Sequence, residues 1–394
     1  MLLFPSLRTS INQNLRGIRF TLQELSGGLG DLGTFIPLTV SMALITGMDI
    51  GIILIFAGLF NIVTGILFGL PIPVQPMKAI ATVAIVERLL PGEIAAAGLA
   101  VGAVLLVLGT TGWVDKLERY VPISVVRGIQ LGIGLQLAIK GIEFVTMTEA
   151  FGWDSISMAL ILGVATLLLR YIRLFPTALI LFIVGAGVTL MAAPAGKEYL
   201  IIRAPHFSFN FPNEIMWSRG IIHGALPQLP LTILNSVIAV CALSGDLFPG
   251  RKIAAGKMAA SVGIMNLLSC GFGALPMCHG SGGLAGQYLF GARTGGSVVM
   301  LGAGKLLMGV FFGAAAMQLL MYFPHSVLGV MLLFTGVELA MSAKDQRRPD
   351  EFFVMMITVV GIVSINTTVG VILGVAAKLL TEMRVFFKDS GSRG

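Results

Sequence analysis

Charged side chains are scarce in this sequence, and cysteines are almost absent. Asp, Glu, Lys and Arg make up only 11% of the 394 residues, whereas 56% are hydrophobic and the mean hydropathy is +0.93. Soluble domains average about 25% charged residues, so this chain has too little polar surface to cover a water-soluble particle. The three cysteines, Cys241, Cys270 and Cys278, have neither the spacing of a metal site nor that of a disulfide framework. The composition predicts a polytopic membrane protein, and nothing in it calls for a metal ion or a cofactor.

Motifs of catalysis and of ATP hydrolysis are lacking as well. The sequence has no H-E-x-x-H, no G-x-S-x-G and no Walker A lysine loop. Gly28-Leu29-Gly30-Asp31 does spell the G-x-G-D of intramembrane aspartyl proteases, but that chemistry needs a second carboxylate that shares a proton. No preceding span supplies one, and no Tyr-Asp pair occurs. We therefore expect that the protein is not an enzyme, while a transporter and a passive channel both stay open.

Apolar segments of the length that crosses a bilayer, about 20 residues, number about fourteen. The predicted spans are 24–46, 50–70, 72–87, 92–111, 120–142, 154–171, 175–194, 220–244, 256–272, 275–291, 296–312, 322–342, 352–365 and 367–386. With the N-terminus inside, nearly all loop Lys and Arg fall on one side, as the positive-inside rule requires. These basic loops are 115–119, 170–173, 250–257, 292–294 and 343–351, followed by the C-terminal tail.

The exception to this charge rule is the outer 195–219 loop, which contains Lys197, Arg203 and Arg219. The net charge of +7 is a topology signal that needs no nucleic-acid partner. Both termini are expected on the cytoplasmic side of the cell (inner) membrane. Charged residues near span ends are expected to snorkel to the interface, and these are Lys140, Glu143, Lys305 and Lys378.

The two halves of the chain repeat a pattern. Residues 121–138 and 323–340 align without a gap, with Pro122 on Pro324 and Gly134 on Gly336. Earlier in each half, Pro-Leu-Thr at 37–39 matches 230–232, and Gly-Leu-Pro at 69–71 matches Ala-Leu-Pro at 274–276. Because each half then holds an odd number of spans, the second copy enters the membrane from the opposite side. This predicts an inverted repeat, the architecture of many secondary transporters.

Each half also breaks a helix at the matching place. In "GLPIPVQPMKAIATV" (69–83), Pro71 and Pro73 disfavour a helix, whereas Pro76 suits the first turn of a new one that runs to about Glu87. In "ALPMCHGSGGLAGQYLF" (274–290), the segment 279–283 opens a second short helix. Two helix N-termini that face each other carry partial positive charge and unpaired N–H groups, so the pattern predicts an anion site.

The predicted substrate ligands cluster at these two breaks and in the eighth span. They are Gln75, Met77, Lys78, Gln228, His279, Gly280, Ser281, Gly282 and Gly283. Glycines let an oxyanion approach the backbone closely, neutral amides and Ser281 donate hydrogen bonds, and Lys78 adds full positive charge. Two alternatives stay open: Lys78 snorkels to the interface from a surface turn, and His279 is a satisfied packing residue.

Further polar residues in the spans are candidates for coupling or support. They are Asp31, Thr34, Asn235, Gln287 and Glu338. Intramembrane carboxylates such as Asp31 and Glu338 suggest proton coupling. The alternatives are that Asp31 only neutralises Lys78, and that Asn235 only bonds one helix to another.

Three of these motifs resemble those of a known family. "GGLGDLGTFIPL" (27–38), "PIPVQPMKAIA" (71–81) and "GALPMCHGSGGLAGQYLFGARTGG" (273–296) are similar to the motifs of the molybdate transporter family, a branch of the sulfate permease superfamily. The resemblance covers almost the whole chain. Typical sulfate permeases continue into a cytoplasmic regulatory STAS domain, and this sequence is expected to lack one.

The resemblance implies an all-α, uracil-permease type of fold with seven plus seven inverted spans. Spans 1–4 and 8–11 would form a core domain (24–112 and 220–312), and spans 5–7 and 12–14 a gate domain (119–195 and 320–386). The remainder would be a cytoplasmic N-terminal segment (1–23), an extracytoplasmic connector (196–219) and a cytoplasmic tail (387–394). Substrate would bind between the half-helices of spans 3 and 10.

The sequence therefore predicts a secondary active importer of a tetrahedral oxyanion, with molybdate as the first choice and sulfate as the alternative. Nucleobase permeases of this fold have carboxylates in spans eight and ten, and their absence here argues against uracil or xanthine. The expected partners are the oxyanion and the lipid bilayer. A homodimer is compatible with the resemblance, because dimers are usual among such relatives.

Overall fold

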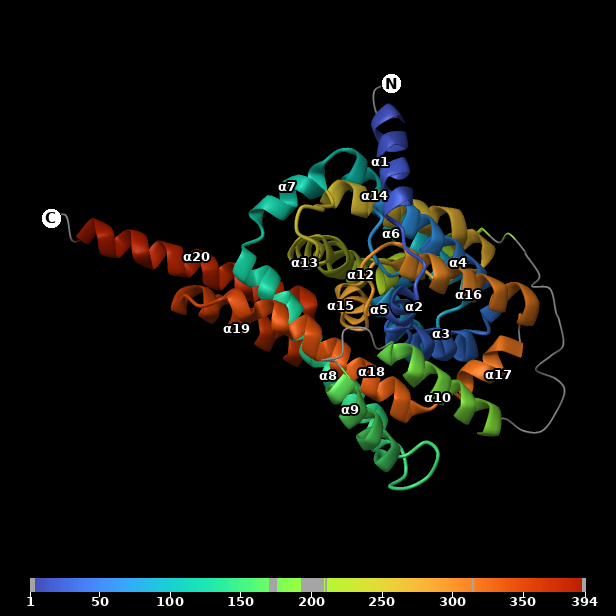
Figure 1. Ribbon diagram of the computed structural model, residues 1–394. Coiled ribbons are helices and arrows are strands. Elements are labelled where there is room, and N and C mark those ends of the chain that lie inside the picture. Colours follow the sequence, from blue (N-terminus) through green and yellow to red (C-terminus); the bar gives the residue numbers. More distant parts are fainter. Residues whose placement is uncertain (1–3, 170–175, 193–208, 210, 314, 392–394) are drawn as a thin grey trace.

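The computed structural model is built almost entirely of helices, with one short pair of strands (Figure 1). It describes residues 4–169, 176–192, 209, 211–313 and 315–391. The predicted basic loop 170–173 and most of the predicted connector 196–219 lie outside these residues. The first half of the chain contains α1 (Phe4–Gly17), α2 (Leu22–Leu29), α3 (Leu32–Thr46), α4 (Ile50–Phe68), β1 (Gln75–Pro76), α5 (Lys78–Glu87), α6 (Pro91–Thr110), α7 (Trp113–Tyr120), α8 (Ile123–Thr146), α9 (Ile156–Leu169) and α10 (Thr177–Ala192).

The second half begins with one long helix that changes its winding along its length. Its successive parts are α11 (Glu214–Arg219), the π-helical η2 (Gly220–Ala225), α12 (Leu226–Leu231), the π-helical η3 (Thr232–Ala239) and α13 (Val240–Leu247). The chain continues through α14 (Ala255–Ser269), η4 (Cys270–Phe272), β2 (Met277–Cys278), α15 (Ser281–Leu289), α16 (Gly296–Phe312), α17 (Ala315–Met321), α18 (His325–Ala340), η5 (Met341–Asp345), α19 (Pro349–Ser364) and α20 (Thr367–Gly391).

Fewer helices than the predicted fourteen are long enough to cross a bilayer by themselves. Among the described residues, five pass by length and apolar composition: α4, α6, α8, the run Glu214–Leu247 and the run His325–Asp345. The pair α2 and α3, bent by 46° at Gly30–Asp31, adds a sixth, and α9, α10 and α16 are shorter apolar helices. The predicted span 24–46 corresponds to this bent pair of helices. The count of fourteen stays a prediction.

Three helix pairs join the two halves of the chain through glycines. α4 packs on α16, α6 on α14, and α8 on α18. A Cβ atom added to Gly58 would lie 2.5 Å from the carbonyl oxygen of Gly302, and one added to Gly134 would lie 2.6 Å from that of Gly336. Small residues permit this close approach of two backbones. In lipid, helix association is driven by such van der Waals packing, because the hydrophobic effect does not act between helices there.

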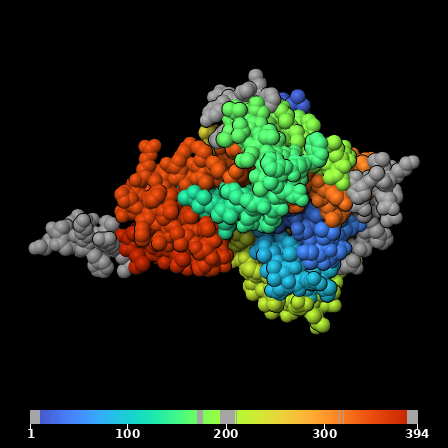
Figure 2. Space-filling view, turned by 90° about the horizontal axis from the view of Figure 1, so that it is seen from below, coloured from blue at the N-terminus to red at the C-terminus, as the bar shows by residue number. Residues whose placement is uncertain are grey.

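The helices form two groups. In Figure 1, α19 and α20 extend to one side, α3, α4 and α16 lie on the other, and α8 and α18 lie between them. In the view from below, the orange and red C-terminal helices lie on one side and the blue N-terminal helices on the other (Figure 2). The large buried core runs through both groups.

Candidate functional site

The two predicted breaks meet at a crossing of two very short strands. β1 pairs with β2 in antiparallel register, with Gln75 opposite Cys278 and Pro76 opposite Met277. Asn266 of α14 supports the crossing, because its side chain accepts from the Met277 amide at 2.8 Å and donates to the Met277 carbonyl at 2.7 Å. α5 and α15 both start directly after the crossing, so two helix N-termini lie close together in the interior.

The N-terminus of α5 is capped by a residue from the other half of the chain. Met77 occupies the N-cap position and provides no side-chain hydrogen bond. Instead, the amides of Ala79 and Ile80 donate to Oε1 of Gln228, at 2.8 and 3.2 Å. The Gln228 side chain is 1% exposed, and its Nε2 donates to Thr232 Oγ1 at 2.7 Å. Two N–H groups that were expected to be free are therefore occupied here.

The N-terminus of α15 is more open. Ser281 Oγ donates to Oδ1 of Asn235 at 2.6 Å, which brings together one predicted ligand and one predicted supporting residue. In the described part of the chain, the backbone amides of Ser281, Gly282 and Gly283 have no hydrogen-bond acceptor. These three donors are what the α15 end can offer to an anion.

Gln75 lies against the α15 glycines and is held by a carboxylate. A Cβ atom on Gly280 would come within 2.2 Å of Gln75 Oε1, and one on Gly283 within 2.4 Å of Nε2, so only glycine leaves room for this side chain. Gln75 Nε2 donates to Oδ1 of Asp31, which lies at the bend between α2 and α3. The other carboxylate oxygen, Oδ2, is buried and has no hydrogen-bond partner among the described residues.

Two lysines supply the positive charge near Asp31. Lys78 is the first residue of α5 and is partly buried. Its carbonyl oxygen accepts from Thr82 Oγ1 at 2.9 Å, whereas its side-chain nitrogen has no hydrogen bond or ion pair with another described residue. Lys305 of α16 is 5% exposed, donates to Asn61 Oδ1 at 3.1 Å and lies 3.5 Å from the ring centre of Phe35. The sequence-based expectation that Lys305 snorkels is wrong, because α16 packs along α4 and turns this side chain inward.

Among the other predicted site residues, His279 has both ring nitrogens engaged. Nδ1 lies 2.9 Å from the Pro73 carbonyl and Nε2 lies 2.7 Å from Ser261 Oγ, while the ring packs edge-on against Phe68. In this structure His279 therefore fixes the extended segment before β1. Met77 is buried, and its amide donates to the Pro276 carbonyl at 2.8 Å.

The remaining supporting candidates are spread over the protein. Thr34 is buried in the first turn of α3, and Gln287 of α15 accepts from Ser297 Oγ at 3.3 Å. Glu338 lies elsewhere, near the end of α18, where it lines a separate cavity of about 310 Å³. The structure thus brings Asp31 and Asn235 to the two helix N-termini and leaves Glu338 apart from them.

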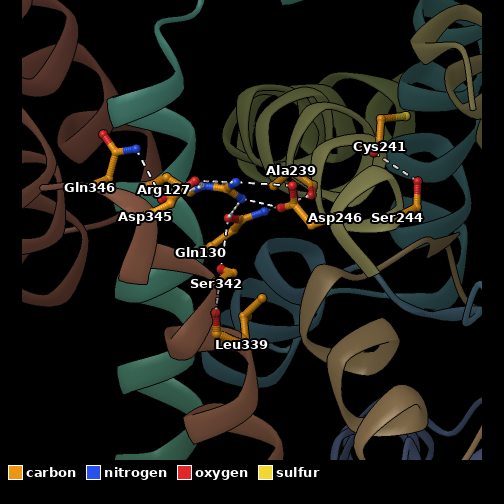
Figure 3. Close-up of polar contacts among 10 residues, drawn as sticks. All are labelled: Arg127, Gln130, Ala239, Cys241, Ser244, Asp246, Leu339, Ser342, Asp345 and Gln346. Carbon is orange, nitrogen blue, oxygen red and sulfur yellow. Dashed lines mark hydrogen bonds and ion pairs between the residues drawn. The ribbon is translucent and has the colours of Figure 1, made fainter. Parts of the chain in front are cut away.

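That cavity contains an ion-pair cluster that the sequence reasoning passed over (Figure 3). Arg127 of α8 is 8% exposed in its side chain and pairs with Asp246 at the end of α13, with Nη2 3.1 Å from Oδ1. It also binds Asp345 of η5, with Nη2 2.7 Å from Oδ2. Gln130 Oε1 accepts from Arg127 Nη1 at 2.9 Å and from Ser342 Oγ at 2.9 Å. The sequence did contain a sign of this cluster, because Arg127 is a charged residue inside the predicted span 120–142.

A comparison with known families identifies the chain. The profile of a family described as "Molybdate transporter of MFS superfamily" matches residues 23–137 and 220–339. This is more than half of the sequence. The protein belongs to the molybdate transporter family. The family predicted from the three motifs is therefore confirmed, and the protein is a membrane transport protein and not an enzyme.

Curated relatives of this family member agree over most of their length. Molybdate transporter 2 of Arabidopsis thaliana is 40% identical over 92% of this chain and 87% of its own. Molybdate transporter 1 of the same plant is 36% identical over 97% of this chain and 92% of its own. Molybdate transporter 1 of Chlamydomonas reinhardtii is 29% identical, over 90% of each chain.

Solved structures show that the fold is shared with anion transporters of remote sequence. The murine Solute Carrier 26 family member A9 anion transporter, in an inward-facing state, aligns with a TM-score of 0.62 at 15% identity, over 96% of this chain and 71% of that one. The transmembrane domain of the cyanobacterial bicarbonate transporter BicA aligns with a TM-score of 0.54 at 17% identity, over 93% of this chain and 97% of that one. The molybdate transporter family member thus has a fold of the SLC26 and BicA type.

Proposed function

We propose that this protein is a secondary active importer of a tetrahedral oxyanion, with molybdate as the first choice. The observation that carries the proposal is the meeting of the α5 and α15 N-termini beside a buried strand crossing, where α15 offers three amides that are unpaired among the described residues. Helix N-termini and oriented amides favour negative charge, and Lys78 adds a cation at the α5 end. The name shared by the curated relatives supports molybdate within this chemical class.

Within this proposal, α5 and α15 are the half-helices of spans three and ten, and the remaining helices complete seven plus seven inverted spans. The order of elements supports the repeat, because a short helix, α7 or α17, precedes the aligned α8 or α18 in each half. The contacts support it too: α4 with α16 and α6 with α14 exchange roles when the two halves are interchanged. The core would be 24–112 with 220–312, and the gate 119–195 with 320–386.

Alternating access would then be motion of the core against the gate. The oxyanion stays at the α5 and α15 ends, and the passage on either side of it opens in turn. Gln75, Gly280 and Gly283 keep the crossing tight, while Ser281 and Asn235 orient the α15 end. We place both termini in the cytoplasm and the protein in the cell membrane, and we expect it to form a homodimer.

Competition for uptake tests the substrate class. Purified protein in proteoliposomes should accumulate labelled molybdate saturably, and unlabelled tungstate should inhibit because it has the same charge and shape. Inhibition by sulfate at equal concentration would favour the sulfate alternative. Inhibition by uracil without inhibition by tungstate would overturn the oxyanion class, and ohmic single-channel currents would overturn the secondary transporter in favour of a channel.

A further inference from the structure

Gln228 occupies an unusual position for a helix cap. Caps are usually supplied by the N-cap residue itself, yet here the oxygen comes from a side chain 149 residues away from Ala79 in sequence. Gln228 lies on α12, between the two π-helical stretches η2 and η3. Departures from α-helical winding of this kind are frequent at functional sites. Whether α5 is capped therefore depends on where one irregular helix lies relative to α5.

The geometry at Gln228 is that of a bound oxyanion. One oxygen accepts from two consecutive N–H groups at a helix N-terminus, which is how such ends receive phosphate or sulfate oxygens. Thr232 fixes the orientation, because it accepts from Nε2 and so keeps the carbonyl oxygen turned toward α5. Seven residues further along the same helix, two turns away, Asn235 contacts Ser281 at the α15 end. One face of this helix thus reaches both N-termini.

We propose that the Gln228 carboxamide is an internal stand-in for the substrate, occupying the Ala79 and Ile80 amides in the empty protein and leaving them when the oxyanion binds. This inference rests on the proposed function and deepens it. A dianion gains charge-assisted hydrogen bonds when it replaces a neutral carbonyl at these amides. A neutral or weakly charged ligand gains little binding energy from replacing the Gln228 carbonyl. Gln228 therefore favours binding of strongly charged oxyanions over such ligands.

Two substitutions at this position separate a stand-in from a ligand. Gln228→Leu keeps a similar volume but frees both amides. It should bind molybdate about tenfold more tightly, a gain of about 1.4 kcal/mol, because the anion no longer has to displace two neutral hydrogen bonds. Gln228→Glu leaves a carboxylate at the amides, and its molybdate binding should fall below detection. The empty Gln228→Glu protein should unfold at or above the wild-type temperature.

The measurements are calorimetric titration of purified protein with sodium molybdate and thermal unfolding with and without it. Gln136→Leu is the matched control. Gln136 lies on α8, outside the site, and donates to the Ile362 carbonyl at 2.9 Å. Its molybdate affinity should equal that of the wild type. Thr232→Val is a second variant that leaves Gln228 in place but removes the contact that orients it, and a smaller gain in affinity is expected.

These measurements distinguish a displaceable cap from a direct ligand or a fixed cap. Weaker or unchanged molybdate binding in both Gln228→Leu and Thr232→Val would overturn the inference and make Gln228 a direct ligand or a fixed cap. If Gln228→Leu does not yield folded protein, Thr232→Val decides alone by the same criterion. A wild-type protein that binds neither molybdate nor sulfate would instead overturn the proposed function, and this inference with it.

Discussion

Removing the Asp246 carboxylate from the Arg127 cluster should make the proposed core–gate boundary open more often. In the proposed division, Arg127 and Asp345 belong to the gate, whereas Asp246 belongs to the core. In this division the Arg127–Asp246 ion pair crosses the core–gate boundary, which opens in the proposed transport cycle, and the Arg127–Asp345 pair does not. Asp246→Asn removes the crossing pair, and Asp345→Asn is its matched control.

The magnitude follows from the exposure of the two partners. The Arg127 side chain is 8% exposed, but that of Asp246 is 39% exposed, so water screens much of the attraction. Surface ion pairs contribute about 0–1 kcal/mol to stability, and the bidentate geometry of Arg127 with Asp246 favours the upper end of this range. A loss of about 1 kcal/mol changes the equilibrium between closed and open forms about fivefold.

Cysteine labelling measures this change. Ala285 of α15 is fully buried and lines the same 310 Å³ cavity, so a cysteine there reacts only when the boundary opens. The three native cysteines are buried and would be replaced by alanine. With Ala285→Cys in this background, a membrane-impermeant maleimide should react about fivefold faster in Asp246→Asn, from one face of oriented vesicles. Equal acceleration in Asp345→Asn, or none in either variant, would refute the assignment of this cluster to the core–gate boundary.

Three further predictions concern binding and stability. Lys78→Met should weaken molybdate binding more than tenfold in a calorimetric titration without lowering the unfolding temperature; unchanged affinity would assign this lysine to the membrane interface. Asp154 lies in the turn before α9 and accepts hydrogen bonds from the two backbone amides that open α18, at 3.0 and 2.8 Å. Burial alone would raise the pKa of Asp154, but hydrogen bonds from this turn of α18 lower it to about 2. Its stabilisation is therefore complete above the ordinary value of 3.8 and is lost as the pH falls toward 2. Asp154→Ala should lower the free energy of unfolding by about 1 kcal/mol at neutral pH and flatten this acid dependence in thermal melts; a melt with the wild-type pH profile would contradict it. Gly302→Leu should prevent folding, because its Cβ would lie 2.5 Å from a carbonyl oxygen of α4. The control Gly304→Leu lies on the same helix, has no atom within 4 Å of its Cβ, and should elute as a monodisperse peak in size-exclusion chromatography. Equal elution behaviour of the two variants would contradict this packing.

Local backbone chemistry explains what could be predicted from the sequence. Pro71, Pro73 and Pro76 act on the residues next to them, so an extended segment and the start of a helix near Pro76 follow from the chain itself. The helix begins at Lys78. The register of β1 on β2 follows from no local rule, because it depends on how the halves approach each other. The pairing of Gln75 with Asp31 is equally remote, 44 residues apart.

Two features were missed for different reasons. The role of Gln228 as a cap could not be found, since a carboxamide in a span looks the same whether it binds a ligand, a helix or an amide end. The glycine contacts could have been predicted, because glycines recur at seven-residue spacing. They occur at 51, 58 and 65 in α4, and at 295, directly before α16, and 302 and 309 within α16. Seven residues make about two helical turns, so this spacing marks a single face on each helix.

The two helix ends are not equivalent, and this bears on how an anion enters the site. The α15 end has three amides for which the described residues provide no acceptor, while the α5 end is occupied by Gln228 and has Lys78 beside it. A tetrahedral anion has several oxygens, so it can engage α15 first without displacing any protein group. In the proposed cycle, replacement of the Gln228 oxygen at α5 would follow, and only that second step would require high charge. Capture and selection would thus belong to different halves of the chain, although the two halves share one design.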